Sequence, residues 1–182
     1  MLVEFVPAYF NGTSTVVPGV ASWALSASSY DTGSPPAPAF DFAVLQLLDP
    51  IGDDLGYFGV RAYSDDWNDD GYWTLVGYPA LVAGGAQPSF QAGIDFHDDD
   101  EDSNDFGDAM ELETQTGDSS AGDSGGPYFA LWDDGPYIVG VDVGGEAEFS
   151  LNPFARWSFE DDNNVASAGN ALVQLVAWAR TQ

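Results

Sequence analysis

The hydroxyl group of Ser124 lies in the stretch of the chain best suited to chemistry, Gly122-Asp123-Ser124-Gly125-Gly126-Pro127. Glycines on both sides of the serine let the backbone turn so that N–H groups can point beside the hydroxyl. Such N–H groups stabilise the oxyanion that forms when a serine attacks a carbonyl carbon. The loop therefore predicts a nucleophilic serine for acyl transfer, with a glycine-rich structural turn as the alternative.

A serine nucleophile needs a neighbouring base, and a Ser–His–Asp mechanism takes a histidine for this role. The sequence contains one histidine, His97, in Phe96-His97-Asp98-Asp99-Asp100. We expect His97 to be exposed or locally paired, with its acidic neighbours favouring the charged form. It is not expected to act as the base.

The elements that must position Ser124 are predominantly β-strands. With 21 glycines and 11 prolines, the chain has many turn signals between short apolar runs. Strands are predicted over Leu2–Val6, Gly19–Ala27, Phe40–Leu48, Tyr57–Ala62, Tyr72–Tyr78, Gln91–Phe96, Met110–Thr114, Tyr128–Trp132, Tyr137–Val143 and Trp157–Phe159. The run Phe40–Leu48 is almost continuously apolar and is expected to be buried on both faces.

The end of the chain shows a different period. Leu172, Leu175, Val176 and Ala179 recur at helical spacing, and Ser167 is the expected N-cap. The sequence thus predicts a β protein closed by one C-terminal amphipathic helix.

Composition and charge limit the possible partners. The 182 residues suit one compact unit or two small lobes, and the absence of cysteine excludes disulfides and thiol catalysis. The net charge of −27 would repel nucleic acid and anionic membranes.

The acidity either keeps a secreted, acid-adapted or salt-adapted protein soluble, or binds cations. For the acidic loop Asp98–Asp105 we expect solvation rather than Ca²⁺ binding, because it lacks the EF-hand spacing. No cofactor or metal is predicted.

Several further motifs support the serine loop. Asp41-Phe42-Ala43-Val44-Leu45 places an acid at the start of a hydrophobic strand. Pro50–Gly59 is followed by Val76-Gly77-Tyr78-Pro79, and Ala121–Pro127 is followed by Ile138-Val139-Gly140-Val141. Together these segments resemble trypsin-like serine proteases of the chymotrypsin fold, most closely the glutamyl-endopeptidase-like branch. The resemblance implies a mostly β fold with two antiparallel β-barrel lobes and a C-terminal α-helix.

The resemblance also implies roles for individual residues. Ser124 would be the catalytic nucleophile, and the N–H groups of Gly122 and Ser124 would form the oxyanion hole. Asp41 would orient the catalytic histidine, the alternative being a strand-edge acid or cap. Asp123 occupies the position whose acid pairs with a new N-terminal amine after activation. It has few candidate partners here, so its loop is expected in an inactive arrangement.

A substrate-binding set follows from the same resemblance. Asp118 stands six residues before Ser124, and Ser119 follows it. In trypsin-like enzymes, the position of Asp118 is at the base of the S1 pocket. Asp142 takes the place of the histidine that borders S1 in the glutamyl branch, so direct repulsion argues against glutamate and favours a basic P1 residue. Val143 and Gly144 would supply the backbone edge for an extended peptide. The alternative for Asp118 is a surface turn.

The general base of this family would precede Met1, so we expect a first lobe that is truncated and open. The expected division is 1–62 for the rest of the first lobe, 63–165 for the second lobe and 166–182 for the helix. The predicted function is a serine endopeptidase acting on peptides or proteins, inactive as this chain because it lacks the histidine. The alternatives are a non-catalytic peptide-binding pseudoprotease and an acidic cation-binding protein. The parent protein is expected to be secreted, although no signal peptide is visible at Met1–Pro7.

Overall fold

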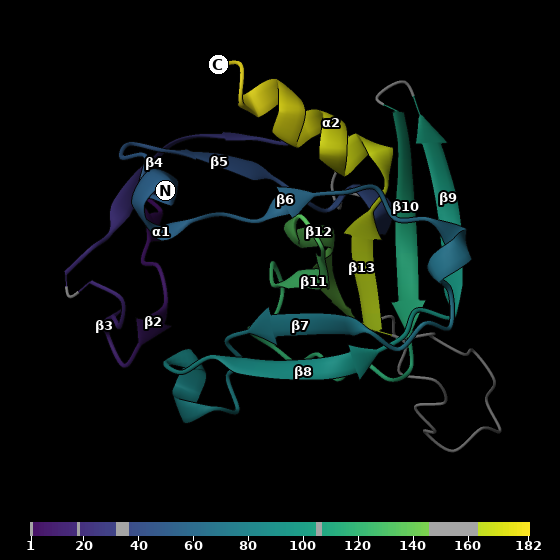
Figure 1. Cartoon of the computed structure of the whole chain (residues 1–182), viewed down its shortest axis with the longest axis horizontal. Helices are drawn as coiled ribbons and strands as arrows, with labels where there is room; N and C mark the ends of the chain where they lie inside the picture. Colours follow the sequence, from purple (N-terminus) through teal and green to yellow (C-terminus); the bar gives the residue numbers. More distant parts are fainter. Residues whose placement is uncertain (1, 18, 32–36, 105–106, 146–163) are drawn as a thin grey trace, which may run out of the picture.

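The computed structural model describes residues 2–17, 19–31, 37–104, 107–145 and 164–182. Its backbone forms one large sheet, one small sheet and a separate hairpin (Figure 1). The small sheet has the order β1-β4-β5, and β2 pairs with β3 in the hairpin. These strands span Glu4–Phe5 (β1), Tyr9–Phe10 (β2), Thr13–Ser14 (β3), Ser22–Ser28 (β4) and Val44–Leu47 (β5).

The large sheet has the strand order β8-β7-β11-β12-β13-β10-β9, and β6 pairs in parallel with β12. All other pairs in this sheet are antiparallel. Its strands span Gly59–Val60 (β6), Trp73–Gly77 (β7), Ser89–Ile94 (β8), Asp98–Asn104 (β9), Gly107–Thr114 (β10), Pro127–Trp132 (β11), Gly135–Gly145 (β12) and Asn164–Ala168 (β13).

An aromatic core holds the large sheet together. In β7, Trp73 and Leu75 are buried while Thr74 and Val76 are partly exposed, as a period of two requires. Trp73 contacts Phe96 with ring centroids 6.2 Å apart, and Phe96 meets Tyr128 edge to face at 5.1 Å. These rings belong to a core that buries apolar surface between β7, β10 and β11. Packing in this core fixes β11, the strand that follows Ser124 in the sequence.

A second core lies under the C-terminal helix α2 (Asn170–Ala179). Leu172 and Leu175 of this helix pack with Phe40 and Phe42. The prediction of one doubly buried strand over Phe40–Leu48 is wrong. Pro38 begins a 3-10 turn, η1 (Pro38–Phe40), and β5 begins only at Val44. Phe40 and Phe42 are buried in this core under the helix, whereas Leu45 in β5 is exposed. The apolar run thus reflects two different environments and not one buried strand.

The predicted start of the helix is also wrong. Ser167 belongs to β13, and its hydroxyl donates to the carbonyl of Pro38 instead of capping the helix. Gly169 is the N-cap residue, with a φ of 90°. A side chain at this position would meet the backbone of Ala109 at 3.1 Å and that of Met110 at 2.9 Å. The chain must therefore pass from strand to helix at a glycine.

Strand β6 connects the two sheets, as Figure 1 shows. Next to it, Arg61 donates to the carboxylate of Asp134 at 3.1 Å and stacks on the ring of Tyr137 at 4.1 Å. The ring of Tyr137 also fills the space beside Gly59, where an added Cβ would lie 2.3 Å from it. Short helical turns complete the connections: α1 (Gly52–Leu55), η2 (Asp65–Trp67) and η3 (Ala83–Gly85).

The architecture is thus mostly antiparallel β with a C-terminal helix, as predicted. Among the described strands, pairing in the large sheet runs as an open path from β8 to β9 and does not close into a ring. The small sheet leaves Trp23, Leu25 and Leu48 exposed. The predicted strand Trp157–Phe159 lies outside the described residues. None of the described helices is long and apolar enough to cross a membrane.

Candidate active site

Ser124 lies in the loop that joins β10 to β11, and this loop packs against the end of β7 and the end of β12. Its side chain is exposed, and its Oγ donates a hydrogen bond to the carbonyl of Val143 at 3.3 Å. The loop is tied to β12 by two backbone bonds: Gly125 donates to Asp142 at 2.7 Å, and Asp142 donates to Gly126 at 2.8 Å. These bonds fix the serine beside the end of β12, an interior strand of the large sheet, and a catalytic group needs such a rigid support.

A β-bulge in β12 makes the carbonyl of Val143 available to Ser124. Asp142 pairs with Ala166 of β13 and Gly144 pairs with Val165, so Val143 has no opposite residue in that ladder. An unpaired residue in a bulge re-aims its backbone groups. The predicted substrate edge at Val143 and Gly144 therefore lies directly beside Ser124.

The glycines of the loop allow a close approach of backbones. Gly122 has a φ of 106°, and a Cβ on it would lie 2.5 Å from the carbonyl oxygen of Tyr78. Among the described residues, the N–H groups of Gly122 and Ser124 donate to no backbone or side-chain acceptor. N–H groups without an acceptor in the serine loop are the donors that an oxyanion hole needs. The role of these groups in catalysis stays a prediction.

Asp123 is buried, with 6% of its surface exposed, and it has found a partner inside its own loop. Its Oδ2 accepts from the N–H of Ser120 at 3.0 Å and from the hydroxyl of Ser120 at 3.2 Å. The packing extends to Gly77, where an added Cβ would lie 2.1 Å from Oδ1 of Asp123. Two hydrogen bonds from Ser120 thus satisfy the carboxylate that the sequence left without an evident partner.

Asp142 is the other buried acid of the site, with 2% of its surface exposed. Its Oδ2 accepts from the hydroxyl of Ser119 at 2.9 Å, and its Oδ1 accepts from the hydroxyl of Tyr128 at 3.3 Å. The structure therefore brings Ser119 into contact with Asp142, two residues that the resemblance had assigned separately to substrate binding. Tyr128 was not predicted, because its contact with Asp142 joins β11 to β12 and leaves no local pattern in the sequence.

Burial controls the ionisation of this cluster. It raises the pKa of Asp142 to about 6, although hydrogen bonds from Ser119 and Tyr128 act in the opposite direction and Asp123 adds to the rise. Burial, followed by the charge of Asp142, raises the pKa of the Tyr128 hydroxyl well above its usual range. Tyr128 is therefore a hydrogen-bond donor at neutral pH.

Asp118 is exposed, and its N–H donates to the side-chain oxygen of Gln91 at 2.8 Å. A carboxylate at the bottom of a closed pocket would be buried, so the surface-turn alternative describes this conformation better. Gln91 makes a second hydrogen bond to the same turn, in which its side-chain nitrogen donates to the carbonyl of Thr116 at 2.5 Å. A role for Asp118 in substrate binding stays a prediction.

Asp41 lies at the end of η1, where its N–H donates to the carbonyl of Pro38 at 3.1 Å. Its side chain is exposed. Through Ser167, the same carbonyl of Pro38 is joined to β13, the strand beside β12. The backbone at Asp41 is therefore held to the strands that carry the serine site, and its role in orienting a base stays a prediction.

His97 is half-buried, not exposed, at the junction of β8 and β9, and the expected pairing with its acidic neighbours stays a prediction. Its N–H donates to the carbonyl of Glu113 at 3.1 Å. Its Nδ1 is buried, and it has no hydrogen-bond partner among the described residues. The backbone N–H of His97 is thus bonded to β10, whereas the hydroxyl of Ser124 is bonded to β12.

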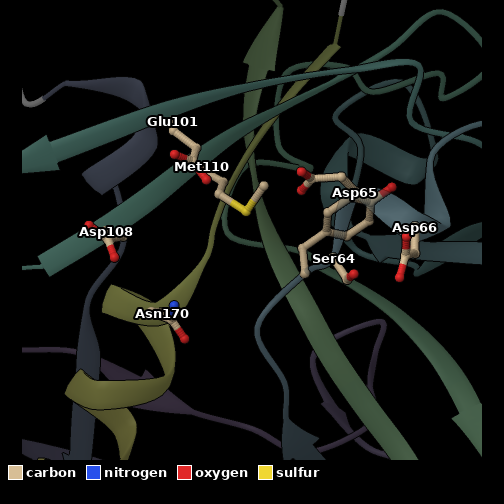
Figure 2. Close-up of a pocket in the computed structure, with 8 residues that line it drawn as sticks. Ser64, Asp65, Asp66, Glu101, Asp108, Met110 and Asn170 are labelled. Atoms are coloured by element: carbon tan, nitrogen blue, oxygen red, sulfur yellow. The ribbon is translucent and has the colours of Figure 1, made fainter.

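Two surface hollows lie apart from the Ser124 loop. One, of about 290 Å³, is lined by Asp65, Asp66, Glu101, Asp108, Asn170 and neighbouring residues (Figure 2). The other, of about 300 Å³, lies between β5 and α2 and is mainly apolar. The segment Asp98–Asn104 is strand β9, so the prediction of a loop there is wrong, and the solvation of its acidic side chains stays a prediction. Within the described part of the chain, no group of three acidic or histidine side chains has a geometry that could hold a metal ion.

Comparison with known proteins gives a result at the level of the fold. No protein-family model matches this chain, and no curated protein sequence matches it. Among solved structures, a Glu endopeptidase in complex with MPD matches with a TM-score of 0.70. The match has 20% sequence identity and covers 100% of this chain and 73% of that chain. The chain therefore has a chymotrypsin-like fold, similar to that of a Glu endopeptidase, as its motifs predicted.

Proposed function

We propose that this chain is a serine endopeptidase domain in which Ser124 attacks the carbonyl of a peptide bond. The observation that carries the proposal is the Ser124 loop: an exposed hydroxyl held against β12, in a loop whose Gly122 and Ser124 N–H groups donate to no acceptor among the described residues. The similarity to a Glu endopeptidase over the whole chain supports it. The expected arrangement is two β-barrel lobes.

In this proposal, an extended peptide pairs with the backbone at Val143 and Gly144 and displaces the hydrogen bond from Ser124 to Val143. The N–H groups of Gly122 and Ser124 then stabilise the oxyanion. Asp41 would orient the imidazole of a base, and Asp118, Ser119 and Asp142 would border the P1 side chain. Deacylation by water would complete the cleavage.

A second candidate function is peptide binding without cleavage. It is favoured by the Ser124 hydroxyl, whose proton is donated to the carbonyl of Val143 and not to a basic side chain. A serine hydroxyl without a base is a poor nucleophile at neutral pH. The two functions share a peptide site and differ in whether Ser124 can be activated.

A fluorophosphonate probe with and without added imidazole distinguishes these functions. Imidazole can supply a base in solution, so Ser124 is expected to react with the probe faster when imidazole is present. Ser124→Ala gives the background, and mass spectrometry of the labelled peptide identifies the site. Peptide binding without labelling under either condition would favour the non-catalytic function. Absence of both would exclude a peptidase site at Ser124.

A further inference from the structure

The separate hairpin of β2 and β3 has two different faces (Figure 1). On the inner face, Ser14 is 2% exposed, and the ring of Tyr9 meets the ring of Tyr78 edge to face with centroids 5.9 Å apart. On the outer face, Phe10 and Thr13 are directly opposite each other and both are exposed. The outer face of the hairpin is therefore open to a modifying group.

The turn of this hairpin consists of Asn11 and Gly12, which both have a positive φ, of 49° and 97°. A two-residue turn with two positive φ angles is of type I′, for which Asn-Gly is a favoured pair. The backbone N–H of Asn11 donates to the carbonyl of Ala86 at 2.7 Å, which anchors the turn. An added Cβ on Gly12 would meet no atom within 4 Å, so the space beside the turn is open.

Asn11-Gly12-Thr13 also has the Asn-X-Thr pattern of an acceptor for N-linked glycans. No other asparagine in the sequence has serine or threonine two residues after it. The Oδ1 of Asn11 accepts from Nε2 of Gln87 at 3.2 Å, whereas its Nδ2 donates to no acceptor among the described residues. The nitrogen to which a glycan is attached is therefore free, in an exposed side chain whose oxygen is held in place.

Phe10 provides a surface on which a sugar ring can pack. Its side chain is 41% exposed, it precedes Asn11, and it projects from the same face as its cross-strand partner Thr13. The face of an aromatic ring carries partial negative charge, which attracts the C–H groups on one face of a pyranose. Packing of this kind would also remove apolar surface of Phe10 from water.

We propose that Asn11 is an N-glycosylation site and that Phe10 and Thr13 form the seat of the first sugar. The substrate is an oligosaccharide linked to a polyprenyl diphosphate, which an oligosaccharyltransferase delivers to chains that cross the export membrane. This agrees with the expected secretion of the parent protein. The modification does not depend on the proposed peptidase activity.

The transfer forms a bond between Nδ2 of Asn11 and C1 of the first sugar. The bond between C1 and the diphosphate oxygen breaks, and the polyprenyl diphosphate leaves with the electron pair of that bond. Nδ2 loses one proton to the transferase. No oxidation or reduction takes place, so the step needs only the lipid-linked sugar and the asparagine.

The site is tested by producing the chain behind a cleavable signal sequence in yeast and recovering it from the medium. We expect a glycan at Asn11. Peptide N-glycosidase in heavy-oxygen water should remove it and leave a labelled aspartate at this position, which mass spectrometry of the peptide detects. Secreted protein without a glycan at Asn11 would overturn the proposed site.

Two substitutions of Thr13 form a matched pair. Thr13→Val keeps the shape of the side chain but removes the hydroxyl, so it should abolish the glycan. Thr13→Ser keeps the hydroxyl and should still be glycosylated. Equal glycosylation of Thr13→Val and the wild type would show that the Asn-X-Thr pattern does not direct the modification.

The seat is tested by differential scanning calorimetry on protein trimmed with an endoglycosidase to one N-acetylglucosamine at Asn11. The reference is the same chain without a glycan, produced in bacterial cytoplasm. We expect the sugar to raise the melting temperature of the wild type by about 2–4 °C. Phe10→Ala should be glycosylated and should lose this rise, because the aromatic face is absent.

Phe5→Ala is the matched control, because Phe5 is a similarly exposed phenylalanine on β1 of the small sheet. This variant should keep the rise in melting temperature. If Phe10→Ala does not fold, Phe10→Leu gives the same comparison, since it keeps the apolar bulk and lacks the ring. An equal rise in the wild type and the Phe10 variant, or no rise in the wild type, would overturn the seat at Phe10.

Discussion

Asp142 is a carboxylate buried beside the candidate nucleophile of a chain that already carries 30 acidic residues. Burying a charge is unfavourable unless hydrogen bonds replace its water. Ser119 and Tyr128 supply two such bonds, and burial still raises the pKa of Asp142 to about 6. The site therefore contains an acid that titrates within the range in which proteins are commonly studied.

The stability of the fold should report this titration. In the unfolded chain the pKa of an aspartate is about 3.9, so between that pH and about 6 the folded state binds more protons than the unfolded state. The stabilising contribution of the protonated form is complete below the unfolded pKa and is lost as the pH rises through the folded pKa. After a discount for solvent screening, we expect a loss of about 2 kcal/mol at this residue.

Asp142→Asn removes this titration, so its free energy of unfolding should fall less between about pH 4 and about pH 7 than that of the wild type. Urea unfolding at a series of pH values measures the difference between the two slopes. The other carboxylates are common to both proteins and cancel in this comparison. Parallel pH profiles would show that Asp142 has an ordinary pKa in the folded protein.

Individual residues differ in how well the sequence predicted them. The exposed Ser124 beside glycines follows from local motif chemistry, whereas the contact between Ser119 and Asp142 was not predicted, because it joins two segments that lie far apart in the sequence. The partner of Asp123 is only three residues away, yet Ser120 has no distinctive pattern in the sequence. The exposure of Asp118 depends on how the turn packs against Gln91 of β8, which no local rule determines.

At the scale of elements, periodicity identified strands whose two faces differ. Strand β7 alternates buried and partly exposed residues, and it is placed within a residue of its predicted bounds. Strand β13 was missed because all five of its residues are buried, so the small residues of Asn-Val-Ala-Ser-Ala show no alternation. Strand β9 was missed because acidic residues are unusual in strands. In both cases tertiary pairing overrides local preference.

The Ser124 loop depends on close packing between elements, and Gly126 tests that packing. A Cβ on Gly126 would lie 2.5 Å from the carbonyl oxygen of Val76 and 2.8 Å from that of Asp123. Both are backbone atoms, so neither can move without shifting β7 or the loop. We expect Gly126→Ala to lower the free energy of unfolding by about 2–4 kcal/mol, measured by urea denaturation.

Gly52→Ala is the matched control for this prediction. Gly52 lies in α1, where an added Cβ would come no closer than 3.8 Å to its nearest neighbour, on Tyr57. A helical alanine is favoured over glycine by about 1 kcal/mol, so this variant should be as stable as the wild type or more stable. Equal losses in both variants would mean that the packing around Gly126 is not specific to the loop.

At the scale of the whole molecule, charge opposes the compact state. The chain has three basic residues and 30 acidic ones, so most carboxylates have no basic partner. In the described part of the chain, Arg61 forms an ion pair with Asp134, and both side chains are partly exposed. Repulsion between unpaired carboxylates is greatest when the chain is folded, and salt screens it. The fold itself rests on the aromatic core around Trp73 and on the apolar core under α2.

The melting temperature should therefore rise with ionic strength. Between about 0.05 M and about 1 M NaCl, the Debye length falls from more than 10 Å to about 3 Å, and most carboxylate repulsion is then screened. Differential scanning calorimetry measures the shift, and CaCl₂ at matched ionic strength is the control. An equal rise in the two salts identifies general screening, since it depends on ionic strength and on no site. A larger rise in CaCl₂ at matched ionic strength would instead favour the cation-binding explanation of the acidity. If the melting temperature did not rise in NaCl, packing in the two cores would outweigh the repulsion between carboxylates.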